Sequence, residues 1–184
     1  MDQCFRALPS RRTRATRRAA NIRTMPLLDL TSAAQDYLKL IWIGAERGAA
    51  PVTVGGLAKS LGISASTASQ GVKKLAEAGL VIHARYGHVE LTPAGRKQAV
   101  LLVRRHRLLE TFLVEMLGYG WDDAHDEADV LEHAASETLT GRIDRLLGQP
   151  GRNPHGDPIP SADPLQTSAK SCCCRSAAAG TQPD

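Results

Sequence analysis

Apolar residues in the first half of the chain recur at intervals of three and four, the spacing of a helix that buries one face. A first helix is predicted between Leu30 and Gly48, with Thr31 or Ser32 available as its N-cap. Its buried face would be formed by Ala34, Leu38, Ile41, Trp42 and Ala45. The pattern therefore predicts an amphipathic helix at the start of the folded part of the chain.

Two shorter helices are predicted next, separated by a tight turn. Thr53 can cap the first of them, and Gly62 supplies its C-terminal break. Ser64 can cap the other, which ends at Gly79. Their inward positions are Leu57, Ala58 and Leu61 in the first and Ala68, Val72, Leu75 and Ala76 in the second. Two helices joined by a Leu-Gly-Ile turn are typical of a helix-turn-helix unit.

The outward face of the helix that follows Ser64 carries polar side chains suited to DNA. They are Ser66, Thr67, Ser69, Gln70, Lys73 and Lys74. A merely solvated helix would also be polar, but it is usually richer in glutamate, and Glu77 is the single acid here. We therefore favour DNA binding, since hydroxyls and a glutamine can reach bases or phosphates and lysines can meet the backbone. Base or phosphate contacts are expected at Ser64, Ser66, Thr67 and Gln70, and backbone contacts at Lys73 and Lys74.

A β-hairpin is predicted after these helices. Two short strands, Leu80 to Ala84 and His88 to Leu91, flank a tip of Arg85, Tyr86 and Gly87. A cation and an aromatic ring at such a tip can lie along phosphates or in the minor groove, and we expect Arg85 to contact the DNA backbone. Helix-turn-helix and hairpin together predict a winged helix.

A long helix is predicted from Thr92 to about Leu117, because Thr92 is a suitable N-cap and Pro93 suits the first helical position. Its apolar residues occupy more than one face: Leu101, Leu102, Leu108, Leu109, Phe112, Leu113, Met116 and Leu117. This excess predicts that the helix packs in a dimer interface as well as in its own core.

The segment from Trp121 to Glu137 holds seven acids and no Lys or Arg. At about 100° per residue, an α-helix would place four potential metal ligands of this segment on one face. They are His125, Asp129, Glu132 and His133. A second pair, His106 and Glu110, lies one turn apart on the long helix. Side chains at this spacing can reach one cation, so a metal site is predicted, and an exposed charged helix is the alternative.

Charge is distributed unevenly behind the formal total of +4. Residues 1–26 contain seven arginines and one acid, and residues 31–97 hold eight Lys or Arg against four Asp or Glu. A basic stretch followed by the acidic segment fits an anion-binding module joined to a cation-binding one.

Both ends of the chain are predicted to lie outside the folded domains. Residues 1–26 are expected to form a disordered basic extension, while a leader resembling a transit peptide, a DNA-contacting arm and a true start at Met25 remain open. Residues 151–184 are poor in apolar side chains and are expected to be a linker and disordered tail.

The cysteines do not have the spacing of a metal site. Cys4 lies near the start and Cys172, Cys173 and Cys174 are adjacent near the end, so they are predicted to be free thiols of an intracellular protein. No apolar run approaches the ~20 residues needed to cross a bilayer, and no signal-peptide core is found. A cytoplasmic location is expected.

Several separated motifs, in order, resemble the diphtheria toxin repressor family of metal-dependent transcriptional repressors, nearest to its manganese transport regulator branch. They are Asp36-Tyr37-Leu38, Ser64-Ala65-Ser66-Thr67-Ala68-Ser69-Gln70, Leu91-Thr92-Pro93-Ala94-Gly95-Arg96, Arg105-His106-Arg107-Leu108-Leu109-Glu110, His125-Asp126-Glu127-Ala128-Asp129, Leu131-Glu132-His133 and Pro154-His155-Gly156-Asp157-Pro158-Ile159-Pro160. The resemblance covers roughly residues 31 to 163.

The resemblance implies two neighbouring metal sites. It places Asp36, Asp129, Glu132 and His133 at the principal regulatory site, and His106, Glu110 and His125 at the other. Because Asp36 lies on the first helix, a metal that joins it to the later helix would tie the two modules together.

Ligand type favours Mn²⁺ as the cofactor, with Fe²⁺ as the alternative. The resemblance implies that iron-sensing relatives carry a methionine and a cysteine where this chain has Asp36 and Asp129, and carboxylate oxygen suits a harder ion. Two features depart from the family. Lys39 stands where the two-domain manganese regulators carry a glutamate ligand. The longer relatives add a C-terminal SH3-like domain, and we expect it to be absent here because the sequence is of low complexity after Pro164.

The predicted fold is mostly α with a small β wing, a winged helix-turn-helix domain followed by an all-α dimerisation and metal-binding domain. The expected boundaries are residues 27–98 for DNA binding and residues 99–150 for dimerisation and metal binding. The predicted function is a homodimeric, Mn²⁺-dependent repressor of metal uptake genes that binds double-stranded DNA at a palindromic operator, without contact with a membrane.

Three other functions remain open at this point. An Fe²⁺-dependent repressor differs only in metal preference, and a winged-helix repressor that senses a small organic ligand would not need Glu132 or His133. A metallohydrolase would need an open coordination position and a positioned general base, and the chain has no nucleophile motif or oxyanion loop. We therefore expect no enzymatic activity and no catalytic residues.

Overall fold

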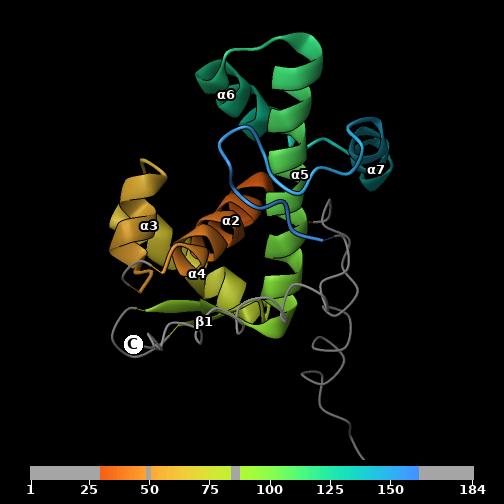
Figure 1. The fold of residues 1–184 in the computed structure, drawn as a ribbon. Helices are drawn as coiled ribbons and strands as arrows, with labels where there is room; N and C mark the ends of the chain where they lie inside the picture. Colours follow the sequence, from red (N-terminus) through yellow and green to blue (C-terminus); the bar gives the residue numbers. More distant parts are fainter. Residues whose placement is uncertain (1–29, 49–50, 84–87, 162–184) are drawn as a thin grey trace, which may run out of the picture.

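A long helix, α5 (Pro93–Leu117), runs through the folded region and joins its two halves (Figure 1). The computed structural model describes residues 30–48, 51–83 and 88–161 of the 184-residue chain. Before α5 come α2 (Ser32–Glu46), α3 (Val54–Ser60), α4 (Ala65–Glu77) and the strands β1 (Val81–His83) and β2 (Val89–Leu91). After it come α6 (Trp121–Leu131) and α7 (Glu137–Leu146). The predicted fold class is confirmed.

The first half is a winged helix-turn-helix. α2, α3 and α4 surround one apolar core, whose buried members include Leu38, Ile41, Leu57, Val72 and Leu75. The strands are antiparallel and pair Val81 with Leu91 and His83 with Val89. Within the described residues each strand has three residues: β1 begins one residue later than predicted, β2 begins at Val89 in place of His88, and the predicted end of the first strand, Ala84, lies outside the described residues. The predicted tip residue Arg85 lies outside the described residues.

Hydroxyl residues predicted as N-caps occupy that position at four helices, and of the two alternatives for α2 the cap is Thr31, while Ser32 is the first helical residue. Thr31, Thr53, Ser64 and Thr92 each accept a hydrogen bond from the backbone N–H three residues later, at 3.3, 3.1, 3.1 and 3.0 Å. Such a cap contributes about 1 kcal/mol to stability. The helix starts are therefore set locally, by side chains that the sequence already displays.

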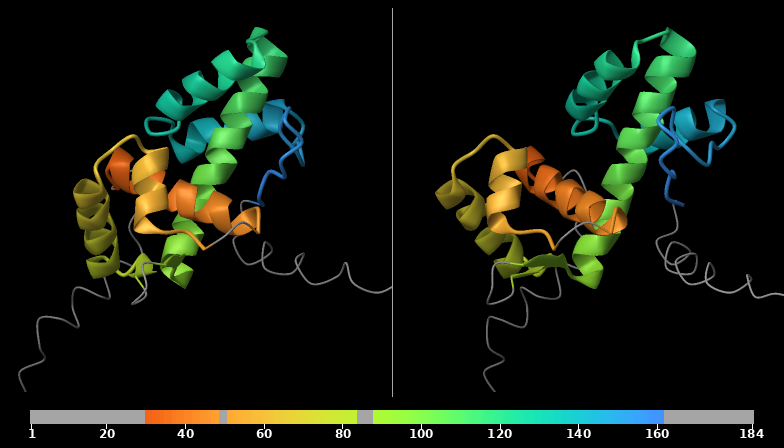
Figure 2. Two further views of the ribbon diagram at one scale, coloured as in Figure 1. Left: turned by 90° about the vertical axis from the view of Figure 1, so that its left-hand side faces the viewer. Right: turned by 60° about the vertical axis from the view of Figure 1, so that its left-hand side comes forward.

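α5 belongs to two cores at once. Its first half packs with the winged helix through Ala99, Leu102 and Val103, and its second half packs with α6 and α7 through Leu108 and Leu113. Figure 2 shows α6 and α7 on the far half of α5 from the wing. Because one rigid helix carries both cores, the metal-ligand residues on α5 lie at the junction of the two halves.

The start of α5 lies directly against the backbone that follows α4. A Cβ atom on Gly95 would stand 1.9 Å from the Leu80 carbonyl oxygen, so a side chain cannot fit there. The Thr92 hydroxyl donates to the carbonyls of Gly79 and Leu80, at 2.7 and 3.1 Å. These contacts hold the wing and the long helix in a fixed relation.

Residues 151–161 form a strap across α5, where the sequence predicted a linker. The strap contains no helix, yet Ile159 is buried in the second core. Arg104 and Arg107 of α5 donate to the carbonyls of Pro160 and Pro158, at 2.7 and 2.6 Å. Composition suggested disorder because the segment has few apolar residues, whereas its backbone carbonyls supply the contacts.

Among the helices in the described ranges, none is long and apolar enough to span a membrane.

Candidate metal centre

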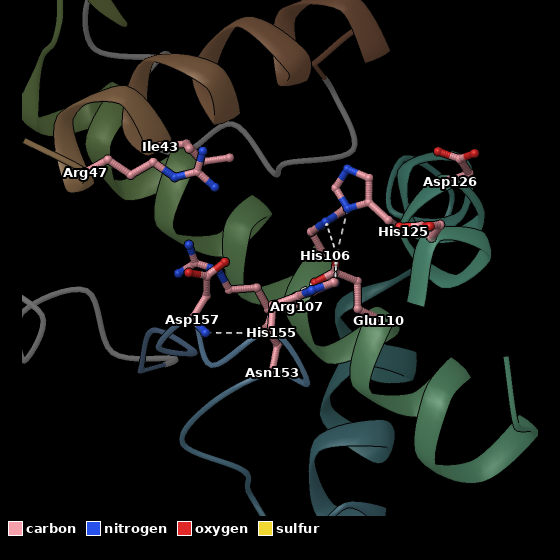
Figure 3. Close-up of a pocket in the computed structure, with 11 residues that line it drawn as sticks. Ile43, Arg47, His106, Arg107, Glu110, His125, Asp126, Asn153, His155 and Asp157 are labelled. Atoms are coloured by element: carbon pink, nitrogen blue, oxygen red, sulfur yellow. Dashed lines mark hydrogen bonds and ion pairs between the residues drawn. The ribbon is translucent and has the colours of Figure 1, made fainter. Parts of the chain in front are cut away.

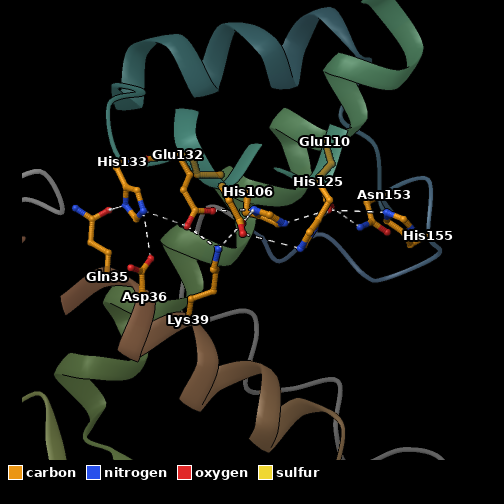
Figure 4. Close-up of polar contacts among 12 residues, drawn as sticks. Gln35, Asp36, Lys39, His106, Glu110, His125, Glu132, His133, Asn153 and His155 are labelled. Atoms are coloured by element: carbon orange, nitrogen blue, oxygen red, sulfur yellow. Dashed lines mark hydrogen bonds and ion pairs between the residues drawn. The ribbon is translucent and has the colours of Figure 1, made fainter. Parts of the chain in front are cut away.

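Carboxylate and imidazole side chains from α2, α5 and α6 converge where the two halves of the structure meet (Figure 4). Asp36 lies on α2, His106 and Glu110 lie one turn apart on α5, and His125 and Asp129 lie one turn apart on α6. Glu132 and His133 follow the end of α6. All seven residues predicted as metal ligands therefore lie in one region.

The structure differs from the predicted single stripe along one helix. α6 ends at Leu131, Glu132 is its C-cap, and His133 lies in the turn beyond. His133 Nε2 still lies within 4.0 Å of Glu132 Oε1, but the two side chains contact different parts of α2. Glu132 reaches α5 and the middle of α2, whereas His133 reaches the start of α2.

Lys39 occupies the centre of this acidic cluster. Its Nζ donates to Asp129 Oδ1 and to Glu132 Oε1, at 2.7 Å each. Burial alone would lower the pKa of Lys39, but the charge of Glu132 and the hydrogen bonds with Asp129 and Glu132 raise it above its ordinary value. The ammonium is therefore charged, and it joins α2 to the end of α6.

His106 is enclosed by carboxylates on both ring nitrogens. Its Nδ1 lies 2.8 Å from Glu132 Oε2 and its Nε2 lies 3.0 Å from Glu110 Oε1. Burial opposes the charged form of His106, but the hydrogen bonds with Glu110 and Glu132 raise its pKa to about 9. Burial likewise opposes the charged form of Glu110, yet His106, His125 and Asn153 lower its pKa to about 2. Both groups are thus charged in the absence of metal.

Asp36 and His133 form the contact nearest the start of α2. His133 Nε2 lies 3.2 Å from Asp36 Oδ1, and His133 Nδ1 lies 3.1 Å from Gln35 Oε1. The Gln35 amide nitrogen donates to the Leu30 carbonyl at 2.9 Å, so the Gln35 oxygen faces His133 and accepts a hydrogen bond from its Nδ1–H. Burial raises the pKa of Asp36, and His133 and Lys39 oppose that rise.

Among the described residues, three groups of donor atoms lie close enough to hold an ion. They are Asp36, Glu132 and His133; His106, Asp129 and Glu132; and His106, Glu110 and His125. The first and third agree with the sets predicted by resemblance, except that Asp129 groups with His106 and not with Asp36. Carboxylate oxygens with imidazole nitrogens suit Mn²⁺, Fe²⁺ or Zn²⁺, and Glu132, fully buried between cationic groups, fits a site built for positive charge.

A cavity of about 520 Å³ lies beside the third group (Figure 3). The strap contributes residues to it that sequence reasoning missed. Asn153 Nδ2 donates to Glu110 Oε2 at 2.8 Å, and His155 Nε2 lies 3.9 Å from Glu110 Oε1. His155 lies between Pro154 and Gly156, outside any helix, so the spacing of ligand residues along a helix could not reveal it. Only the tertiary fold brings it to this site.

The predicted DNA-binding face of α4 is open to solvent. Ser66, Thr67, Ser69, Gln70, Lys73 and Lys74 are all exposed. Ser64 is exposed too, but its oxygen accepts the Thr67 N–H as the helix cap and contacts the hydroxyls of Ser66 and Thr67. A DNA contact at Ser64 would therefore have to share an oxygen that already caps the helix.

Comparison with known proteins agrees with this arrangement of domains. Residues 29–89 match the family model described as "Iron dependent repressor, N-terminal DNA binding domain". Residues 92–161 match "Iron dependent repressor, metal binding and dimerisation domain". A winged helix followed by a helical metal-binding domain defines a class of metal-responsive DNA-binding proteins. The chain belongs to the iron-dependent repressor family, and the resemblance seen in its motifs is confirmed.

The relatives with similar sequences include an iron-dependent repressor and the diphtheria toxin repressor. The chain is 37% identical over 132 residues to the iron-dependent repressor IdeR of Mycobacterium leprae, covering 72% of this chain and 57% of that protein. It is 35% identical over 137 residues to the diphtheria toxin repressor of Corynebacterium diphtheriae, covering 74% and 60%.

Two solved structures illustrate the similarity to the manganese branch. A manganese-dependent transcriptional repressor in complex with manganese is 60% identical, with a TM-score of 0.67, over 70% of this chain and 59% of that chain. The manganese regulator SloR is 38% identical, with a TM-score of 0.65, over 72% and 61%. The chain spans less than two thirds of the length of each of these relatives.

Proposed function

We propose that this protein is a metal-dependent transcriptional repressor that binds DNA as a homodimer, with Mn²⁺ as co-repressor, and controls genes for metal uptake. The observation that carries the proposal is the position of Asp36. This carboxylate lies on α2 of the winged helix and contacts His133 beyond α6, next to the fully buried Glu132.

A cation held by Asp36, Glu132 and His133 would tie the DNA-binding half to the dimerisation half. When bound, the ion would supply positive charge and coordination bonds between elements that otherwise meet through hydrogen bonds. Restricting the orientation of the winged helix would favour two copies spaced for two half-sites, about one helical turn of DNA apart or a multiple of it. A palindromic operator follows from such two-fold symmetry.

Manganese is proposed because of the donor atoms. None of the three donor groups contains sulfur, and carboxylate oxygens with imidazole suit a harder divalent ion. The similarity to manganese-dependent repressors supports the same choice. Fe²⁺ is the second candidate, since the curated relatives IdeR and the diphtheria toxin repressor belong to the same family.

Dimerisation is proposed through the second half. Large apolar side chains are exposed at the end of α5, in α6 and α7 and in the turn between α5 and α6: Met116, Leu117, Tyr119, Trp121, Val130, Leu131, Leu139 and Leu146. Exposed apolar surface of this kind marks association sites in soluble proteins. A regulator of this kind would act where the DNA is, in the cytoplasm.

The proposal is tested by measuring DNA binding of the full chain with Mn²⁺, Fe²⁺, Zn²⁺, Co²⁺ or chelator, the Fe²⁺ arm being anaerobic. The probe is a DNA fragment selected by the protein from a random-sequence pool in the presence of the metal mixture. Mn²⁺ should increase affinity at least tenfold over chelator, a difference of about 1.4 kcal/mol. Equal affinity in chelator and in every metal would contradict the proposal.

A matched pair of variants locates the effect. Glu132→Gln should abolish the response to metal, because Glu132 belongs to two of the three donor groups. Glu115→Gln makes the same chemical change at an exposed position on α5 and should respond like the wild type. If Fe²⁺ at equal free concentration gives a larger response than Mn²⁺, the second candidate replaces the first.

A further inference from the structure

Lys39 places a positive charge inside one of the three donor groups. Its Nζ lies 2.7 Å from Asp129 Oδ1 and 2.7 Å from Glu132 Oε1. These two carboxylates form one donor group with His106, and Figure 4 shows the Lys39 side chain reaching toward Glu132 and His106. The Lys39 side chain is 9% exposed, so solvent screens this charge very little.

An ammonium at this position and a divalent ion at the same carboxylates compete with one another. Lys39 Nζ already engages Asp129 Oδ1 and Glu132 Oε1, and His106 Nδ1 lies 2.8 Å from the other Glu132 oxygen, so an ion at Glu132 meets oxygens that face a side-chain nitrogen. Two like charges a few ångströms apart in a buried region also repel strongly. An ion that uses Glu132 or Asp129 must therefore weaken or displace the Lys39 contact.

The same contact links the two halves of the structure without metal. Lys39 is on α2, while Asp129 is on α6 and Glu132 caps it, about ninety positions away in the sequence. Breaking a buried ion pair by removing one partner is costly because a charge is left uncompensated. Lys39 thus compensates the acidic cluster and holds α2 against the end of α6 before any ion arrives.

We propose that Lys39 is an internal cation that competes with the metal ion for Asp129 and Glu132, and so sets the metal concentration at which the protein responds. The inference rests on the proposed metal binding and adds to it a residue that opposes loading. In the metal-free protein the Lys39 ion pairs already link α2 to α6. Metal binding then replaces these ion pairs with stronger coordination bonds, and does not join two separate halves.

Mn²⁺ titration of the full chain in the absence of DNA tests this inference, with free Mn²⁺ followed by electron paramagnetic resonance. Lys39→Met and Lys39→Gln remove the charge, and Lys39→Arg retains it. Lys97→Met is the matched control, since Lys97 is exposed on α5, away from the cluster. The uncharged variants should bind Mn²⁺ roughly tenfold more tightly or take up an additional ion. Lys39→Arg and Lys97→Met should stay close to the wild type.

Hydrogen exchange in chelator provides a second readout. Loss of the tether should speed amide exchange in residues 36–46 and 121–133 of Lys39→Met relative to both the wild type and Lys97→Met. Should neither uncharged variant fold in chelator, recovery of the fold on addition of Mn²⁺ supports the tether. Failure to recover with Mn²⁺ overturns it.

The proposal is overturned if both uncharged variants bind Mn²⁺ with wild-type affinity and ion number, or more weakly. That result would leave Lys39 as a support for folding alone. Failure of the proposed function gives a different result, because the wild type itself would then bind no Mn²⁺, or bind it without any change in DNA affinity.

Discussion

Glu132 contacts residues of both α2 and α5 at the centre of this protein. Its side chain is fully buried, and its two oxygens accept from Lys39 and His106 at 2.7 and 2.8 Å. Its backbone carbonyl accepts from Arg105 at 2.9 Å. A buried carboxylate is stable only with such compensation, so this position requires cations at all times. Metal-free protein supplies them from its own lysine and histidine.

The pH dependence of metal-free stability follows from the same neighbourhood. The pKa of His106 rises from 6.5 to about 9, so its contribution is complete below pH 6.5 and is lost as pH rises through 9. The pKa of Glu110 falls from 4.5 to about 2, so its contribution is present above pH 4.5 and is lost as pH falls through 2. The unfolding free energy should therefore decline below pH 4.5 and above pH 6.5, by up to about 3 kcal/mol on the alkaline side.

Urea unfolding in chelator between pH 3 and pH 10 measures this profile. His106→Gln serves as the reference, because it cannot titrate and should lose the alkaline decline. A wild-type unfolding free energy that stays flat from pH 6.5 to pH 9 would show that His106 is not charged in the metal-free protein.

At the scale of elements, the close contact between α5 and the backbone at Leu80 sets how the wing meets the long helix. Gly95→Ala places a Cβ 1.9 Å from the Leu80 carbonyl oxygen and should destabilise the protein by about 2 kcal/mol, since overpacking forces the backbone to move. Gly141→Ala, within α7 and with no atom near the added Cβ, should stabilise by about 0.5 to 1 kcal/mol. Chemical denaturation compares the two, and equal effects would contradict the packing argument.

The residues predicted to contact DNA lie mainly on the exposed face of α4. Lys73→Ala and Lys74→Ala should weaken binding to all DNA sequences alike and should each lower the slope of log affinity against log salt by about one. Gln70→Ala should cost about 1 to 3 kcal/mol on the selected DNA and much less on random DNA, because a glutamine reads base edges. Fluorescence anisotropy at several salt concentrations separates these outcomes. Lys97→Ala is the exposed control, and an equal loss there would argue against a contact through α4.

At the scale of the whole molecule, the cluster of candidate metal ligands lies between two hydrophobic cores that share α5. Metal binding should therefore stabilise both halves together. At a free Mn²⁺ concentration one hundred times the Kd, the linkage relation gives about 2.7 kcal/mol. Thermal unfolding followed by circular dichroism should show one transition that moves upward with Mn²⁺, and Asp36→Asn should reduce the rise. The coupling would be contradicted by two separate transitions, if Mn²⁺ raised only the one that belongs to the C-terminal half.

Local features of this protein were predictable from sequence because they depend on neighbours along the chain. The caps at Thr31, Thr53, Ser64 and Thr92 lie three residues from the N–H groups they accept. Helix spacing likewise displayed Leu38, Ile41 and Trp42 on the buried face of α2 and the pairing of His106 with Glu110, although Ala45, predicted on that face, is exposed. The motifs also identified the family, since several short patterns in a fixed order are specific.

Contacts between distant segments were decided only by the tertiary structure. Asp129 pairs with Lys39, ninety residues earlier, and groups with His106 and Glu132, whereas the resemblance placed it with Asp36. The strap at residues 151–161 has the composition of a linker, yet its carbonyls and Asn153 bind α5.

By itself, then, the sequence determined the helices, their caps, the winged helix and the set of ligand-type side chains, because each depends on spacing along the chain. Only the tertiary structure decided which of these side chains share an ion-sized space and that Lys39 stands among them. The physical reason is that charge compensation in a buried cluster depends on distance in space, and residues 39 and 132 approach one another only when α2 packs beside the end of α6.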